Sequence, residues 1–254
     1  MIENKTFCIL PFIHFNGYMD GTAKACCDSQ KTFTDIDLNS TDINTAFNSD
    51  EYKKLRLDML NGVENSYCTA CYDLEKQDIN SSRLRWNEHH IKKIAGLEKK
   101  YFNKKNFKGE IEPNFISLDL RPSNICNFKC RMCGDMLSSS WETEQKSHDM
   151  VNWTDPKNNW MRGGIRAQIK DFQENQIEAE FAAAVEQHRV EEVYWVGGEP
   201  LMYEQHWRYM KRIIELGDGQ NVYARYNTNL SRVRYGGVDL FDDILKHIRD
   251  WQIC

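Results

Sequence analysis

Apolar and polar residues alternate in short, irregular runs over the first part of the chain. Up to about residue 85 these runs are separated by Asn, Asp, Ser, Thr and Gly. The apolar run over 8–15 predicts a strand. A turn at Asp20-Gly21 followed by a second extended segment predicts a hairpin. Apolar residues at helical spacing predict helices over 48–60 and 69–76.

From residue 114 onwards, strand patterns alternate with helical ones. Alternating apolar positions predict a strand at 114–120. A short strand that breaks at Gly197-Gly198 is predicted in 190–200, and a strand that ends in polar residues is predicted at 221–230. Helical spacing predicts helices at 165–188, 204–216 and 241–251, and the last residues, 251–254, look like the start of another strand. Strands that alternate with helices indicate parallel βαβ units.

These two patterns predict an α/β protein in two parts. We expect a small, cysteine-rich α+β domain over residues 1–85 and a β/α domain over residues 113–254. Between them, residues 86–112 are predicted to be a linker. The basic, polar stretch at about 82–109 is expected to form a helix and a loop whose charges make a solvated face.

Charge and hydropathy narrow the class of protein. The chain has 33 basic and 38 acidic residues, a formal net charge of −5, which argues against a broad electrostatic grip on nucleic acid or on an anionic membrane. Apolar runs stay below the roughly 18 residues that would span a bilayer, and the N-terminus does not read as a signal peptide. We therefore expect a cytoplasmic protein without nucleic-acid or membrane partners.

Nine cysteines are unusual for such a chain. Reducing compartments disfavour disulfides, so clustered cysteines there indicate metal or redox ligands. Apart from Cys254, they form an early group and a later group: Cys8, Cys26, Cys27, Cys68 and Cys71, and then Cys126, Cys130 and Cys133.

The later group has the spacing of a loop that wraps one cluster, with three and then two residues between its thiols. Iron–sulfur clusters usually take four thiolates, so three would leave one iron open, and open metal positions are where substrates react. The loop follows a predicted strand, at the end that carries active sites in parallel barrels. A three-cysteine zinc site completed by a histidine, or three unrelated core thiols, would also give this spacing.

Two further motifs follow later strands. Gly197 and Gly198 allow close backbone approach to a ligand, and Glu199 can accept hydrogen bonds from a ligand ammonium group. An ordinary strand-to-helix turn would also explain Gly-Gly-Glu-Pro. Asn227 and Asn229 make a polar strand end, for which a helix N-cap is the alternative.

The segment CNFKCRMC, residues 126–133, resembles the CxxxCxxC signature of the radical S-adenosylmethionine (SAM) superfamily. The resemblance implies a [4Fe–4S] cluster on Cys126, Cys130 and Cys133, whose open iron binds SAM. It implies reductive cleavage of SAM to a 5′-deoxyadenosyl radical. Met132 stands where many members place an aromatic residue beside the adenine.

The two later motifs match the same family, in the same order along the chain. The resemblance implies that Glu199, with Gly197 and Gly198, contacts the amino group of SAM. It implies that Asn227 and Asn229 lie near its ribose or carboxylate. Three motifs in the family's order, each at the end of a predicted strand, support the resemblance more strongly than any one of them.

The early cysteines resemble the first half of the auxiliary-cluster domains called SPASM, in the shortened form called twitch. The resemblance implies a second [4Fe–4S] cluster that serves electron transfer or structure, because four thiolates would saturate it. Its expected ligands are Cys8, Cys26, Cys68 and Cys71. Cys27 is the alternative to Cys26, and a structural zinc site would fit the same four cysteines.

The resemblance also implies a (β/α) TIM-like barrel, here partial and apparently truncated. Three clear strands, four at most, precede Cys254, fewer than the family barrel has. The chain is expected to be a fragment, a natural truncation, or a partner of a second chain that completes the barrel.

We thus predict a radical SAM enzyme, with peptide or protein modification as the substrate class by analogy. An electron donor such as flavodoxin or ferredoxin would reduce it, and no catalytic residue beyond the cofactor ligands is assigned. The alternatives are a non-catalytic iron–sulfur electron-transfer or partner subunit, and a zinc-binding interaction module.

Overall fold

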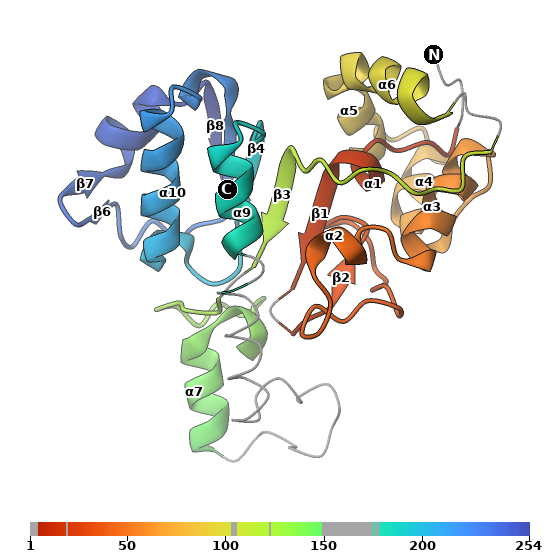
Figure 1. Ribbon diagram of the computed structural model, residues 1–254. Coiled ribbons are helices and arrows are strands. Elements are labelled where there is room, and N and C mark those ends of the chain that lie inside the picture. Colours follow the sequence, from red (N-terminus) through yellow and green to blue (C-terminus); the bar gives the residue numbers. More distant parts are fainter. Residues whose placement is uncertain (1–4, 19, 103–105, 122, 149–174, 176–177) are drawn as a thin grey trace. The chain divides into compact units, whose positions relative to one another are not determined.

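The computed structural model describes residues 5–18, 20–102, 106–121, 123–148, 175 and 178–254 (Figure 1). The chain folds as two compact units. The first contains residues 1–16 and 22–115, and the second contains residues 17–21 and 116–254. Across the described ranges, the helices lack the length and apolar character that a membrane span requires.

The first unit consists mainly of short helices. Its strands β1 (His14–Gly17) and β2 (Ala23–Lys24) are neighbours in a sheet, as the predicted hairpin requires. The predicted helices over 48–60 and 69–76 are confirmed as α3 (Asp50–Leu60) and α4 (Thr69–Glu75). The other elements are α1 (Leu10–Ile13), α2 (Ile43–Ala46), the 3₁₀ turn η1 (Ser66–Cys68), α5 (Ser82–His89), α6 (Ile91–Leu97) and the π turn η2 (Glu98–Phe102).

The strand predicted over 8–15 is wrong in its first half. Residues 10–13 form the helical turn α1, and extended backbone begins only at His14. Pro11 lies in the first turn of α1, where a missing N–H leaves no helical hydrogen bond unmade and the fixed φ of proline suits a helix.

The described residues of the segment expected to be a linker, 86–102 and 106–112, belong to the first unit. Arg56 Nη1 donates a buried hydrogen bond to the Gly109 carbonyl oxygen (2.9 Å). Asn48 Nδ2 donates to the Ile111 carbonyl oxygen (2.8 Å). Because these bonds fasten the end of the segment to α3 and to the turn before it, the boundary between the units falls at residue 115.

The second unit is built on parallel strands. In sheet order they are β3 (Ser117–Leu120), β4 (Glu192–Trp195), β5 (Tyr223–Tyr226) and β8 (Asp250–Ile253), each parallel to its neighbour. The mixed α/β class with a mostly parallel sheet is thereby confirmed. The remaining elements are η3 (Asp135–Leu137), α7 (Ser139–Ser147), α9 (Glu178–Glu186), η6 (Pro200–Met202), α10 (Glu204–Glu215), η7 (Gly219–Asn221), β6 (Arg234–Tyr235), β7 (Val238–Asp239), η8 (Leu240–Ile244) and η9 (Leu245–His247).

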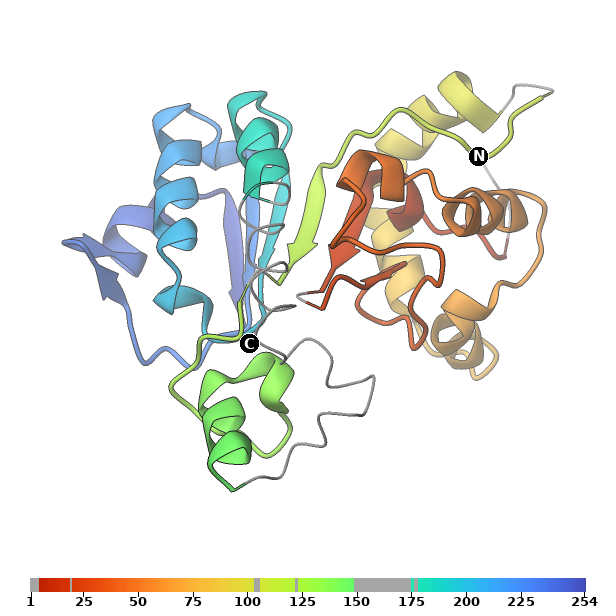
Figure 2. The same ribbon diagram turned by 60° about the horizontal axis from the view of Figure 1, so that its bottom comes forward.

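Helices α9 and α10 cover one face of this sheet (Figures 1 and 2). Trp195 of β4 packs edge-on against Phe181 of α9 (5.7 Å between ring centroids) and against His206 of α10 (5.0 Å). Tyr226 of β5 is hydrogen-bonded to the same histidine (3.1 Å). Since the strands are adjacent and parallel, the carboxyl ends of β3, β4 and β5 meet at one edge of the sheet.

One helix predicted for the second unit ends early in the structure, and another is described only in part. The segment predicted as a helix over 241–251 is helical only as far as His247, as the π turn η8 followed by the 3₁₀ turn η9. Strand β8 then begins at Asp250, and the strand start expected at 251–254 is confirmed within it. The Arg249 amide donates to the Gly219 carbonyl oxygen (2.8 Å), which draws the chain into the sheet instead of continuing a helix. The helix over 165–188 is described only from residue 178, as α9; residues 165–174 and 176–177 lie outside the described part.

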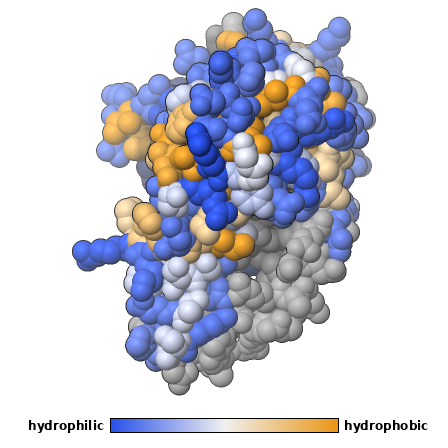
Figure 3. All heavy atoms as spheres, turned by 90° about the vertical axis from the view of Figure 1, so that its left-hand side faces the viewer, coloured by the Kyte–Doolittle hydropathy of each residue, from blue (hydrophilic) through white to orange (hydrophobic). Residues whose placement is uncertain are grey.

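The hairpin β6–β7 was not predicted. Gly236 and Gly237 form its turn with φ angles of 55° and 82°, which a two-residue hairpin favours. Figure 3 shows the molecule from the side on which β6 and β7 lie in Figure 1: hydrophilic surface prevails there, with smaller apolar patches. Phe241 of η8 and Trp251 of β8, 42% and 43% exposed, lie against each other (6.4 Å between ring centroids).

Candidate functional site

The three later cysteines lie on the loop between β3 and α7. The first turn of α7 and its N-cap hold the loop backbone by side-chain hydrogen bonds from Ser138, Ser139, Ser140 and Trp141. Ser138 caps α7 by accepting from the Trp141 amide, and its Oγ donates to the Phe128 carbonyl oxygen (2.6 Å). The start of a helix therefore shapes this loop.

The three sulfurs of this loop are accessible and influence one another. Cys130 is exposed, and Cys126 and Cys133 are half-buried. Partial burial raises the pKa of Cys126, and the nearby charges of Glu199 and Cys130 raise it further. Partial burial, followed by the charges of Cys130 and Cys126, raises the pKa of Cys133. Because the three thiolates repel one another, a cationic metal centre between them would stabilise them.

The two glycines after β4 bring their backbone against the start of the cysteine loop. The Gly198 amide donates to the Ser123 carbonyl oxygen (3.1 Å), and the Glu199 amide donates to the Ile125 carbonyl oxygen (2.7 Å). A Cβ on Gly198 would stand 2.3 Å from that Ile125 oxygen, and Gly197 has a φ of +117°. Both positions therefore require glycine.

The Glu199 carboxylate is buried, 1% exposed, and joins the ends of β4 and β5. Its Oε1 accepts from the Leu201 amide (3.0 Å) and from the Thr228 hydroxyl (2.5 Å), and its Oε2 accepts from the Asn229 amide (2.7 Å). The first of these bonds caps η6, as an ordinary strand-to-helix turn would. A carboxylate has about four lone-pair sites, so about one, on Oε2, is left for a further donor.

Of the two predicted asparagines, Asn229 reaches the cysteine loop. Its Nδ2 donates to Cys126 Sγ (3.9 Å) and to Asn127 Oδ1 (3.2 Å). Asn227 is exposed, and its backbone amide extends the β4–β5 pairing by donating to the Trp195 carbonyl oxygen (3.0 Å). The structure thus brings Asn229, but not the Asn227 side chain, to the three cysteines.

Sequence reasoning missed several residues that shape this site. Thr228, between the two asparagines, is one. Asn124, 1% exposed, donates to the Asp135 carbonyl oxygen (2.9 Å) and to Glu142 Oε2 (2.8 Å), which ties the start of the loop to α7. The run of serines over 138–140 could have indicated that a helix begins beside the cysteine loop, because serine favours the N-cap of a helix.

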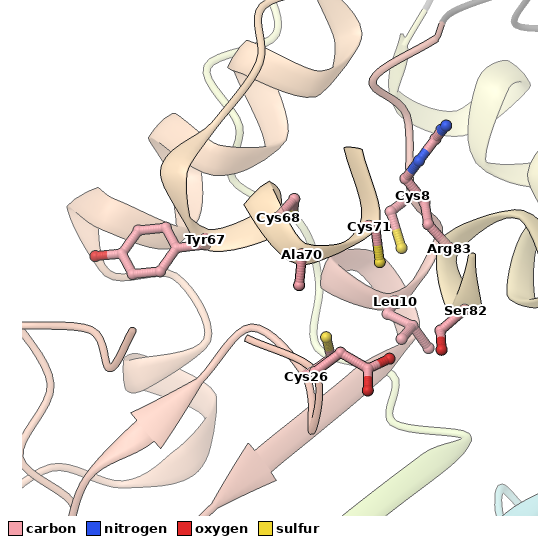
Figure 4. Close-up of a pocket in the computed structure, with 10 residues that line it drawn as sticks. Cys8, Leu10, Cys26, Tyr67, Cys68, Ala70, Cys71, Ser82 and Arg83 are labelled. Carbon is pink, nitrogen blue, oxygen red and sulfur yellow. The ribbon is translucent and has the colours of Figure 1, made fainter. Parts of the chain in front are cut away.

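The first unit brings together the four early cysteines that were predicted as one set. A single pocket is lined by Cys8, Cys26, Cys68 and Cys71, together with Arg83 (Figure 4). They come from the segment before α1, the segment after β2, the end of η1 and the first turn of α4. Cys27 is exposed and does not line this pocket.

Three of these four sulfurs face a backbone amide, those of Leu10, Asp28 and Arg83. The fourth, Cys68, lies beside the hydroxyl of Tyr72, which donates its hydrogen bond to the Thr6 carbonyl oxygen (3.2 Å). Burial raises the pKa of all four thiols, that of Cys68 to about 12. Donors aimed at buried sulfurs suit thiolates that a cationic centre compensates.

Both groups consist of thiols alone, the donor set of iron–sulfur clusters. In the ranges that the structure describes, no three His, Cys, Asp or Glu side chains are grouped to hold a single metal ion. Ligands of a cluster bind different irons and so stand around it, as the four early cysteines stand around their pocket. Both sets of cysteines therefore suit an iron–sulfur cluster.

A comparison with protein families matches residues 120–251, just over half of the chain, to the Radical SAM superfamily. The match begins at the end of β3 and includes the cysteine loop, the glycines after β4 and the end of β5, while the four early cysteines lie outside it. Searches of curated proteins and of solved structures found no match. With a family match of this extent, the chain belongs to the radical SAM superfamily.

Proposed function

We propose that this chain is an enzyme that cleaves SAM reductively at the loop of Cys126, Cys130 and Cys133. Membership of the superfamily implies a [4Fe–4S] cluster and SAM. When bound, the cluster would supply the electron that breaks the sulfur–C5′ bond and gives the 5′-deoxyadenosyl radical. The observation that carries this proposal is the bonded connection from Cys126 through Asn229 to Glu199, which joins the ends of β3, β4 and β5.

The residues of this chain would hold SAM by simple contacts. The remaining lone-pair site on Glu199 Oε2 suits the ammonium group of the methionine moiety, a charge-assisted contact. Gly197 and Gly198 let the backbone approach that group closely. Met132 is 99% exposed and is free to pack its polarizable sulfur on the adenine. Asn229, which contacts the cysteine loop, would lie near the ribose or carboxylate of SAM, with Asn227 exposed after the end of β5.

We also infer a second [4Fe–4S] cluster on Cys8, Cys26, Cys68 and Cys71, in a twitch-like domain. The shared pocket and the backbone amides that face three of the four sulfurs support it. Four thiolates leave no open iron, so this cluster would serve electron transfer or structure. Metal analysis tests it directly: zinc without acid-labile sulfide would show a structural zinc site instead.

We infer an electron donor, a substrate and a second chain as partners, from exposed side chains and from analogy with the family. The tip of the cysteine loop, with Phe128 44% exposed, offers access to a reduced donor such as flavodoxin or ferredoxin. A peptide or protein is the proposed substrate class, on analogy with the SPASM family alone. Strand β8, with Trp251 exposed, lies at the edge of the sheet and is where a second chain would add strands.

The test is anaerobic reconstitution with iron and sulfide, followed by reduction in the presence of SAM. We expect 5′-deoxyadenosine from the wild-type chain and none from Cys130→Ala. The matched control, Cys254→Ala, removes an exposed thiol of the same unit and should keep the activity. A chain with intact clusters that forms no 5′-deoxyadenosine would contradict the enzyme proposal and favour a non-catalytic iron–sulfur protein.

A further inference from the structure

Side chains of helix α5 are hydrogen-bonded to the backbone on both sides of Cys8. Arg83 Nη1 donates a buried hydrogen bond to the Phe7 carbonyl oxygen (2.7 Å). Asn87, one helical turn later, donates to the same oxygen (2.8 Å), and its Oδ1 accepts from the Ile9 amide (2.9 Å). The peptide groups before and after Cys8 are therefore fixed by one face of α5.

Arg83 also belongs to the four-cysteine pocket itself. It lines that pocket, and its backbone amide faces the sulfur of Cys71. Its side chain is 4% exposed and lies near the ring of Tyr72 (5.7 Å to the centroid). One arginine thus touches the segments that carry two of the four cysteines and places a buried positive charge beside them.

Glu75 is the counter-charge of this arginine. Arg83 Nε donates to Glu75 Oε1 (2.9 Å), and Arg83 Nη2 makes a second bond to Oε2. The Ser81 hydroxyl, which caps α5, also donates to Oε1 and lies beside Cys71. Glu75 is 18% exposed, so water screens its charge more than that of Arg83.

We propose that Arg83 is the positioning residue of the four-cysteine centre, holding the Cys8 and Cys71 segments and raising the reduction potential with its buried charge. This inference rests on the proposed second cluster. Net charge near a cluster sets its potential. Reduction adds an electron to a centre that four thiolates already make negative, so a nearby cation favours the reduced form. Removing Glu75 should act in the opposite direction to removing Arg83.

The test uses the full chain with Cys126→Ala, Cys130→Ala and Cys133→Ala, so that only the early centre gives a signal. Iron and acid-labile sulfide are measured first, and the midpoint potential is then measured by redox titration followed by electron paramagnetic resonance. Arg83→Gln should lower the potential, and Glu75→Gln should raise it. We expect a change of roughly tenfold in the ratio of reduced to oxidised centre, about 59 mV for one electron.

The double variant Arg83→Gln/Glu75→Gln has no net change of charge, so its potential should return towards that of the parent. If Arg83→Gln fails to assemble a centre, the midpoint potential of Glu75→Gln still tests whether the charges of this ion pair set the potential, and a positive shift is expected. A centre that assembles with the same potential in all variants overturns the role of Arg83 and leaves the second cluster standing. A parent chain that holds no iron and sulfide would rule out both the second cluster and the role of Arg83. The SAM-cleaving activity is tested separately, by formation of 5′-deoxyadenosine in the wild-type chain.

Discussion

Among single residues, Glu199 has the contacts that make the site one structure. Its amide bonds to the start of the cysteine loop, and its carboxylate bonds to Thr228 and Asn229 after β5. Asn229 then returns to Cys126. Because a buried acceptor that loses its donors costs about 1–3 kcal/mol, these residues should hold the ends of three strands in register around the cysteines.

Glu192, at the start of β4, is a buried carboxyl group of a different kind. It is 3% exposed, and its Oε2 has no hydrogen-bond partner within the described part of the chain. Burial raises its pKa from 4.5 to about 7, although Arg225 (3.7 Å) opposes this. The folded protein therefore holds this proton to higher pH than the unfolded chain does.

The free energy of unfolding should consequently contain a part that is present below pH 4.5 and is lost as pH rises to about 7. Glu192→Gln should remove that loss and be more stable than wild type at pH 8, by about 3 kcal/mol at most. Urea denaturation at pH 5 and pH 8 measures the difference. A variant whose stability relative to wild type is the same at both pH values would show that Glu192 does not titrate in this window.

At the scale of elements, the close approach of the segment after β4 to the segment after β3 organises the site. Gly198 allows it, since a Cβ there would collide with backbone atoms of the cysteine loop, at 2.3 Å and 2.7 Å. Helix α7 holds the same loop from its other end through Ser138–140. The loop is thus fixed between the end of a strand and the start of a helix.

Gly198→Ala should therefore displace the cysteine loop. We expect a loss of about 1–3 kcal/mol in stability, with reduced iron content at the three-cysteine site. Gly134→Ala is the matched control, because that glycine lies beside the same loop, has a φ of −98°, and nothing stands within 4 Å of a Cβ built on it. Denaturation and iron analysis of both variants check this; equal behaviour of the two would contradict the close approach.

At the scale of the whole molecule, sequence patterns foresaw most of the sheet. Alternating apolar residues located β3, β4 and β5, and cysteine spacing located the loop after β3. The early end of the last helix, at η8 and η9, was missed, because the apolar residues keep helical spacing up to Trp251 while the contact of Arg249 with Gly219 draws the chain into β8. Contacts between distant segments, such as Glu199 with Thr228, carry no local pattern.

The first unit also contains features that sequence patterns do not predict. Residues 82–109 were expected to expose their charges, but Arg83 is 4% exposed because it pairs with Glu75 and Phe7. Hydropathy cannot distinguish a buried, paired arginine from a solvated one. The four early cysteines were recognised as a set by resemblance, and their shared pocket depends on the fold of α4 and α5 around α1.

The most direct test of SAM binding at the three-cysteine loop is the electron paramagnetic resonance spectrum of the reduced, reconstituted chain with and without SAM. An open iron at Cys126, Cys130 and Cys133 would take SAM as a ligand, so we expect SAM to change the spectrum. The variant with all three replaced by alanine should show no such change. A wild-type spectrum that is identical with and without SAM would show that this loop does not bind SAM through an open iron.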